Sequence, residues 1–282
     1  MKVFLETSIK RYLERVEDLL LQQETNNNLM LGLLERGKNN IGVFTDGIRL
    51  GIVEESGEPI YAFMQTPPNK WILPTVNNQH EHAIQAVVQF LFQHKYPVPG
   101  VIGSSELVDE FVGLWKNLTS KSEQTHMKQL IYQLDEVKVT PDPKGKLIQG
   151  QEEHVSLVRD WLRLFGEQAN MEIAKTQADS MARSYIQKGS IYFWETEGEL
   201  VSMANNSRRT RNGASVNAVF TPDEHKRKGY ATSVVAALSQ KLLDEGATFC
   251  SLYTDLSNPT SNSIYKKIGY YVVGDSVDCL FE

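Results

Sequence analysis

Cysteine is scarce in this sequence, which contains only Cys250 and Cys279. Neither residue lies in a Cys-x-x-Cys pair, so the sequence offers no zinc ribbon, dithiol redox motif or disulfide framework. We therefore expect two buried free thiols in a protein of a reducing compartment.

Long apolar runs are also missing. The first residues, MKVFLETSIKRYLERVEDLLLQQ, carry charges throughout and lack the continuous apolar segment of a secretory signal. No run approaches the roughly 20 apolar residues that a membrane-spanning helix needs. These absences predict a cytoplasmic protein with no membrane partner.

Positive charge is in deficit, because the formal net charge is -6. Affinity for nucleic-acid backbones comes from many Lys and Arg side chains on one face, so no nucleic-acid partner is expected. The composition, 41% hydrophobic and 23% charged, is typical of soluble globular proteins with one or two cores. A local cluster of Lys and Arg in such a chain needs a local explanation.

The 282-residue chain shows a change of pattern near its middle. Pro141, Pro143 and Gly145 interrupt both helix and strand periodicity, and each side has the size of an ordinary domain. We predict a domain over 1–140, a linker over 141–147 and a second domain over 148–282.

Both halves show the same order of predicted elements. In the first half, helices are expected over 9–34 with an interruption at 24–28, over 80–94 and over 106–118, and strands over 41–46, 48–56, 59–66 and 128–134. In the second half, helices are expected over 152–166, 177–188, 230–245 and 260–268, and strands over 190–196, 200–205, 214–220, 248–255, 270–273 and 277–281. The repeated order predicts two similar domains of mixed α/β class.

The stretch DEHKRKGYATSVVAAL, residues 223–238, joins a predicted strand to a predicted helix. The first N–H groups of a helix lack intrahelical partners and the helix dipole adds positive charge, so this position suits an anion. Gly229 permits a close approach of the backbone, while Lys226, Arg227 and Lys228 add cationic donors. The alternative for the charge run alone is a solvated basic turn.

A second stretch, LYTDLSNPTSNSIYKKIGYYVV, occupies residues 252–273. Asn258 and the following proline form a turn signal, and Asn262 and Tyr265 lie three residues apart on one face of a predicted helix. Each residue has a structural alternative. Asn258 is then a turn former, Asn262 a surface amide and Tyr265 a partly buried aromatic.

In this order, the two stretches resemble motifs A and B of the GNAT N-acetyltransferase superfamily. Lys226, Gly229 and Ala231 match Gln/Arg-x-x-Gly-x-Gly/Ala, with Lys226 in the place of Gln or Arg. The second stretch matches Asn-x-x-x-Asn-x-x-Tyr-x-x-x-Gly-Tyr. The resemblance is specific over 216–270. It implies a degenerate GNAT-like N-terminal domain without the phosphate loop and a catalytic C-terminal one, each with a mixed, mostly antiparallel sheet flanked by helices.

The resemblance implies transfer of an acetyl group from acetyl-CoA to a primary amine, which attacks the thioester directly in a ternary complex. A backbone N–H would stabilise the oxyanion, and Tyr265 would protonate the leaving thiolate. Asp255 is the candidate base, with Glu195 as a weaker one. The pantetheine arm would pair with the backbone of one strand, and the pyrophosphate would meet the basic loop. The implied cofactor-binding residues are Val219, Thr221, Lys226, Arg227, Lys228, Gly229, Tyr230, Ala231, Thr232, Asn258 and Asn262.

Alternatives to this function stay open. They are a non-catalytic CoA-binding regulatory module and a transferase of a longer acyl group. The acceptor, a small-molecule or peptide amine, and the oligomeric state are not specified by the sequence.

No metal is expected, because His80 and His82 point apart on a helix. The arginines of NNSRRTRNG, residues 205–213, are expected in a solvated hairpin tip.

Overall fold

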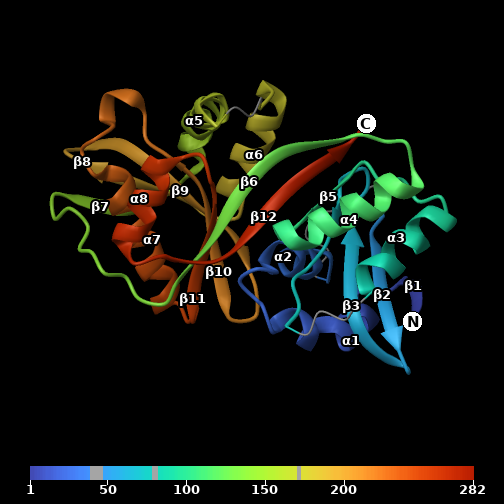
Figure 1. Ribbon diagram of the computed structural model, residues 1–282. Coiled ribbons are helices and arrows are strands. Elements are labelled where there is room, and N and C mark those ends of the chain that lie inside the picture. The colour runs from blue at the N-terminus through green and yellow to red at the C-terminus, as the bar shows by residue number, and fades with distance from the viewer. Residues whose placement is uncertain (39–46, 78–81, 170–172) are drawn as a thin grey trace. The chain divides into compact units, whose positions relative to one another are not determined.

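The structure is a computed structural model that describes residues 1–38, 47–77, 82–169 and 173–282. Figure 1 shows the order of its elements along the chain. The chain forms two compact units. The first comprises residues 1–131, 254–257 and 272–282, and the second comprises residues 132–253 and 258–271. The last segment of the chain thus belongs to the first unit, and the predicted linker lies within the second.

The first unit contains a mainly antiparallel sheet in the order β1-β2-β3-β4-β5-β12. The pair of β4 with β5 is parallel, whereas the other pairs are antiparallel. Its elements are β1 (Lys2–Glu6), α1 (Ile9–Leu21), α2 (Asn28–Lys38), β2 (Arg49–Glu55), β3 (Glu58–Gln65), β4 (Trp71–Ile72), α3 (Ala83–Gln93), β5 (Gly100–Gly103), α4 (Ser105–Leu118), β6 (Glu123–Leu134) and β12 (Tyr271–Phe281). The last residues of β6 and the first of β12 belong to the second unit.

Helices cover both faces of this sheet. Side chains of a strand alternate between faces. Tyr61 and Phe63 of β3 therefore join the core with α3 and α4, while Ala62 and Met64 join the core with α1 and α2. Burial on both sides explains why β3 is a continuous apolar run rather than an alternating one.

The second unit contains strands in the order β11-β10-β9-β8-β7. Only β10 and β11 pair in parallel among the described pairs of this unit. Its elements are β7 (Gly145–Gln149), α5 (Val155–Gln168), α6 (Lys175–Gln187), β8 (Ile191–Thr196), β9 (Glu199–Arg209), β10 (Gly213–Phe220), α7 (Tyr230–Asp244), β11 (Phe249–Asp255) and α8 (Pro259–Ile268). Each unit is thus a mainly antiparallel sheet flanked by helices, which confirms the predicted fold class.

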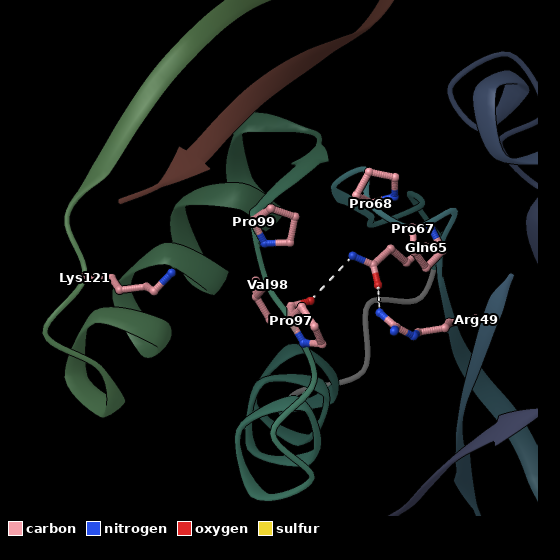
Figure 2. A pocket seen from close by; sticks show the side chains of 8 residues that line it. All are labelled: Arg49, Gln65, Pro67, Pro68, Pro97, Val98, Pro99 and Lys121. Atoms are coloured by element: carbon pink, nitrogen blue, oxygen red, sulfur yellow. Dashed lines mark hydrogen bonds between the residues drawn. The ribbon is translucent and has the colours of Figure 1, made fainter. Parts of the chain in front are cut away.

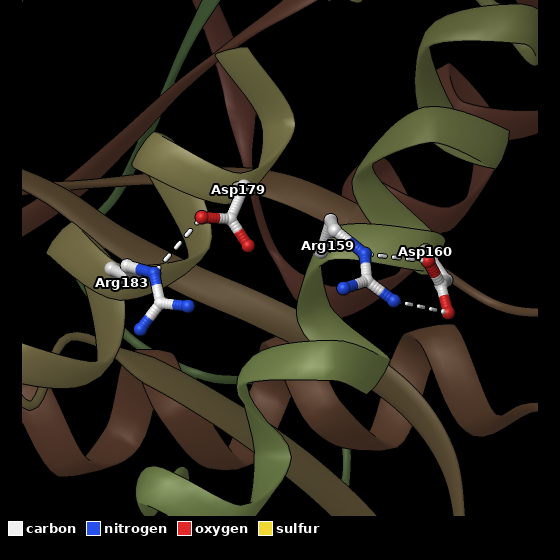
Figure 3. A network of polar contacts seen from close by, with 4 residues as sticks. All are labelled: Arg159, Asp160, Asp179 and Arg183. Carbon is white, nitrogen blue, oxygen red and sulfur yellow. Dashed lines mark hydrogen bonds and ion pairs between the residues drawn. The ribbon is translucent and has the colours of Figure 1, made fainter. Parts of the chain in front are cut away.

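Two helices of the second unit, α5 and α6, pack on one face of its sheet through apolar residues such as Leu162 and Ala182. Their ion pairs lie within single helices: Arg159 bonds Asp160 at 2.9 Å, and Arg183 bonds Asp179 at 2.9 Å (Figure 3). The bond from Arg159 lowers the pKa of Asp160. Because such surface pairs contribute little stability, the apolar contacts hold this helix pair on the sheet.

The predicted elements agree with the structure except at short or non-local strands. β1, β4, β5 and β7 were not predicted, and β7 begins inside the predicted linker. The two predicted closing strands are one strand, β12. The strand predicted over 41–46 lies outside the described residues. In the described ranges, no helix is long and apolar enough to cross a membrane, and no cluster of His, Cys, Asp or Glu suits a metal ion.

Alanine substitutions at two glycines of the first unit should have opposite effects on the free energy of unfolding. Gly51 of β2 faces Phe63 of β3, whose ring atoms lie 2.2 Å from the position of an added Cβ. Gly51→Ala should lower the free energy of unfolding by about 1–3 kcal/mol through overpacking. Gly113 is exposed on α4 with no described atom within 4 Å of that position. Gly113→Ala should raise the free energy of unfolding by about 0.5–1 kcal/mol. Denaturant unfolding checks both, and equal effects would contradict this packing.

Candidate functional site

The turn between β10 and α7 leaves the start of α7 without a side-chain cap. Gly229 takes the N-cap position with a φ of 86°, and no side-chain hydrogen bond caps the helix within the described part of the chain. The N–H of Ser233 donates to the carbonyl of Gly229 at 3.0 Å. The amides of residues 230–232, which include Tyr230, Ala231 and Thr232, therefore precede the first bond of the helix. These amides suit an anion.

The space in front of Gly229 is open. No described atom lies within 4 Å of the position that a Cβ would take there. Arg227 also has a positive φ, 64°, so the loop turns through two left-handed residues before the helix begins. Glycine adopts this conformation at little cost, whereas other residues are strained in it. A phosphate can therefore approach the amides without displacing protein atoms.

The cationic side chains of this loop lie at the surface. Lys226 pairs with Asp223 at 2.7 Å, and the two side chains are 42% and 82% exposed. Arg227 and Lys228 are also exposed. Such a pair exchanges readily with another anion because its net strength in water is small. This ion pair was not predicted, although Asp223 stands three residues before Lys226.

The pairing of β10 with β11 ends early. Their register stops at Ser215 and Ser251, although β10 continues to Phe220. In the same stretch the register of β10 against β9 shifts, and Ala218 has a φ of 47°. The described pairing therefore leaves the end of β10 open on its β11 side.

Two residues at the end of β10 were predicted to pair with the cofactor. Val219 is half-buried and lies in the irregular stretch. Thr221 is buried, and its hydroxyl lies 2.8 Å from that of Ser202. The Ser202 hydroxyl donates to the carbonyl of Phe220 at 3.0 Å. These bonds hold the end of β10 on β9, so the opening toward β11 is fixed.

Tyr265 of α8 is a buried phenol, 8% exposed. The rings of Tyr132 and Tyr270 lie beside it, with centroid distances of 6.3 and 6.0 Å. Burial raises the pKa of Tyr265 well above its ordinary value, because a phenolate there would lose its hydration. Among the described residues no hydrogen bond to its hydroxyl is found. Its proton is therefore retained at neutral pH and is available to a new partner.

Helix α7 is linked to the end of α8 through Tyr270. The hydroxyl of Tyr270 lies 2.8 Å from that of Ser239 on α7, and both side chains are buried. The N–H of Tyr270 donates to the carbonyl of Tyr265 at 3.0 Å. Within the second unit, the basic loop and Tyr265 therefore lie on helices that a buried hydrogen bond holds together.

The two motif asparagines already have hydrogen-bond partners. Asn258 caps α8, because its side chain accepts from the N–H of Ser261 at 3.0 Å. Asn262 donates to the carbonyl of Asn258 at 2.8 Å and accepts from the hydroxyl of Tyr132 at 3.1 Å. These bonds fix the start of α8 and the ring beside Tyr265, and a direct role of the asparagines in cofactor binding stays a prediction.

The two candidate bases have different surroundings. The carboxylate of Asp255 accepts from the N–H and the hydroxyl of Ser257, at 2.8 and 2.7 Å, and Asp255 belongs to the first unit. Glu195 pairs with Lys146 at 3.0 Å. Asp255 thus stabilises the turn that follows β11, and its role as a base stays a prediction.

Sequence reasoning missed a buried polar chain that ends beside the irregular stretch of β10. Ser190 donates to Asn205 at 2.7 Å, and Asn205 donates to the side-chain oxygen of Asn217 at 2.8 Å. Asn205 is fully buried, whereas Asn217 is exposed. The Asn217 amide group thus presents its N–H donors next to Ala218. Strand register alone brings these residues together, so no local motif could have revealed them.

The candidate site lies in the part of the chain that matches a known family. Residues 196–277 match the family described as FR47-like protein, and this segment contains both the loop before α7 and Tyr265. A comparison with curated proteins finds no match.

Several solved structures share the fold over the whole chain. An acetyltransferase of the GNAT family from Colwellia psychrerythraea has a TM-score of 0.65 and 11% identity, with 100% of both chains covered. A GCN5-related N-acetyltransferase from Sphaerobacter thermophilus has a TM-score of 0.63 and 10% identity, covering 99% of this chain and 95% of its own. A tandem GNAT protein from the clavulanic acid biosynthesis pathway has a TM-score of 0.59 and 10% identity, covering 100% and 98%. The resemblance to the GNAT superfamily that the two motifs indicated is therefore confirmed, and the chain has the tandem fold of GNAT acetyltransferases.

Proposed function

We propose that this protein is an acetyl-CoA-dependent N-acetyltransferase that moves an acetyl group to a primary amine by direct attack in a ternary complex. One observation carries the proposal: the second unit combines uncapped amides at the start of α7, an open end of β10 and the unpartnered phenol of Tyr265. Phosphate binding, thioester placement and thiolate protonation each need one of these features. Fold alone would not specify this chemistry.

The basic loop would hold the donor. The amides of Tyr230, Ala231 and Thr232 would donate to the pyrophosphate, and the open space at Gly229 would admit it. Lys226 would exchange Asp223 for a phosphate, with Arg227 and Lys228 adding to the positive potential. Backbone groups of Val219 and Thr221, at the open end of β10, would pair with the pantetheine arm as an added strand does.

When bound, acetyl-CoA supplies an activated acyl carbon in a thioester. A backbone N–H in the irregular stretch at Ala218 would stabilise the negative charge on the carbonyl oxygen as the amine nitrogen forms its bond to the carbon. When the C–S bond breaks, Tyr265 would give its proton to the sulfur. Asp255, directly or through water, is our proposal for the group that takes the amine proton.

The acceptor is a small-molecule or peptide amine. Among the described side chains around the opening, Asn217 offers N–H donors beside Ala218, so an acceptor with an oxygen near its amine would be held there.

The two thiols of the protein are buried and free, which suits the proposed cytoplasmic, reducing setting. Burial raises the pKa of Cys250 to about 12. The protein thiols should therefore not disturb an assay of thiol release from acetyl-CoA.

Tyr265→Phe tests the proposed acid. In a panel of primary amines, thiol release from acetyl-CoA should fall roughly 10²–10⁴-fold in kcat, as loss of a general acid predicts. Acetyl-CoA binding, measured by calorimetry, should be unchanged because the ring is retained. Tyr61→Phe is the matched control, since it removes a buried hydroxyl of the first unit, outside the proposed site. Equal turnover in Tyr265→Phe and the wild type would exclude the acid role, and a wild type that binds acetyl-CoA without any turnover would favour a regulatory module.

Substitutions in the loop before α7 distinguish the contribution of the backbone amides to acetyl-CoA binding from that of the cationic side chains. Gly229→Val adds a branched side chain at a positive φ and in the open space, so it should weaken acetyl-CoA binding by more than about tenfold. Lys226→Ala removes an exposed, already paired cation and should weaken binding by less than about fivefold. Gly57→Val is the matched control, because Gly57 of the first unit also has a positive φ, 92°, and open space. A larger effect of Lys226→Ala than of Gly229→Val in calorimetry would contradict amide binding.

A further inference from the structure

A pocket of about 440 Å³ lies in the first unit, at one end of its sheet. Three connections form it. Pro67 and Pro68 come from the segment between β3 and β4, residues 97–99 from the segment between α3 and β5, and Lys121 from the segment between α4 and β6 (Figure 2). The pocket is distinct from the proposed acetyl-CoA site, whose residues belong to the second unit.

The arginine of this pocket is held in place by a buried amide. Gln65 is 1% exposed, and its side-chain nitrogen donates to the carbonyls of Asn69 at 2.7 Å and Pro97 at 3.5 Å. Because both N–H groups have acceptors, the amide oxygen of Gln65 faces Arg49, which donates to it (Figure 2). The guanidinium also lies 5.4 Å from the ring centroid of Tyr96. Arg49 is therefore oriented before any ligand arrives.

Positive charge in the pocket is not neutralised by the protein. The side chains of Arg49 and Lys121 point toward the pocket from opposite sides (Figure 2). Among the described residues, no carboxylate lines the pocket, and neither cation forms an ion pair. A guanidinium has five N–H donors, and the described contacts use one of them. Two unneutralised cations in a chain of net charge -6 favour an anion.

The rest of the lining is apolar. Four prolines and Val98 supply the walls, so a bare inorganic anion would leave most of them without a partner. Small-molecule sites typically combine such walls with a few placed polar groups, and their volumes run from about 300 to 1,000 Å³. The pocket has a size and composition of this kind.

We propose that the first unit binds a small organic carboxylate with an apolar body in this pocket. Arg49 binds the carboxylate through two N–H groups, as guanidinium groups do, and Lys121 adds charge attraction from the other side. The apolar body lies against the prolines, where it leaves water. The first unit, which lacks the phosphate loop, would thus bind a ligand different from acetyl-CoA.

Benzoate is the probe, with acetate and inorganic phosphate as comparisons, in an NMR titration of the full-length protein labelled with ¹⁵N. Benzoate should shift the amide of Val98 and the side-chain N–H of Arg49. It should bind tighter than acetate, which lacks the apolar body, and tighter than phosphate. No shift with millimolar benzoate would overturn the proposal, and equal affinities for the three anions would overturn the apolar part of it.

Three variants locate the site. Arg49→Gln should weaken benzoate binding about tenfold or more, because a charge-assisted pair is lost. Lys121→Ala changes an exposed side chain and should weaken it a few-fold. Lys10→Ala, on α1 with 84% of its side chain exposed, makes the same charge change elsewhere and should have no effect. If Lys10→Ala weakens binding as much as Lys121→Ala, the attraction is non-specific and the site is wrong. Acetyl-CoA affinity should be unchanged in all three variants.

Discussion

The burial of α7 on the sheet of the second unit is the constraint on which the candidate site depends. Val234, Leu238 and Leu242 are at most 1% exposed, so the position of this helix is fixed by the core. Its C-terminal end is fixed too, because the N–H of Gly246 donates to Leu243 and that of Ala247 to Leu242, the pattern of a glycine-terminated helix. A rigid helix can present its first amides at a constant place, and this is what anion binding at a helix start requires.

Burial also sets the protonation states in the second unit. Tyr265 and Cys250 both lose hydration, so the pKa of each group is raised and each stays neutral at physiological pH. The charged groups, by contrast, stay at the surface on the loop before α7. A neutral acid in the interior and cations at the surface form the separation that a thioester bearing a charged carrier group would need.

Many elements of the fold and many residues of the candidate site could be predicted from the sequence. The features that could not be predicted share one cause. The bounds of α7 and α8 were predicted closely. Apolar spacing indicates both helices, and Gly229 and Asn258 mark the residues at which they start. The pairing of β12 with β5 could not be predicted, since it joins residues more than 150 positions apart and a four-residue strand carries little pattern. The same holds for Tyr132 beside Tyr265 and for Asn205 beside Asn217, which strand register and packing bring together. The candidate site residues could be recognised from local sequence motifs. The residues that contact and position them are distant in sequence, so only the tertiary structure shows them.

Hydrogen–deuterium exchange of the intact protein, with and without acetyl-CoA, tests the central claim most directly. Our account predicts that saturating acetyl-CoA slows exchange at the amides of residues 230–232, because they become hydrogen-bond donors to the pyrophosphate. The loop around Gly57, with a similar backbone, should exchange at the same rate in both samples. Unchanged exchange at 230–232 in a protein saturated with acetyl-CoA, or the absence of any binding, would contradict the account.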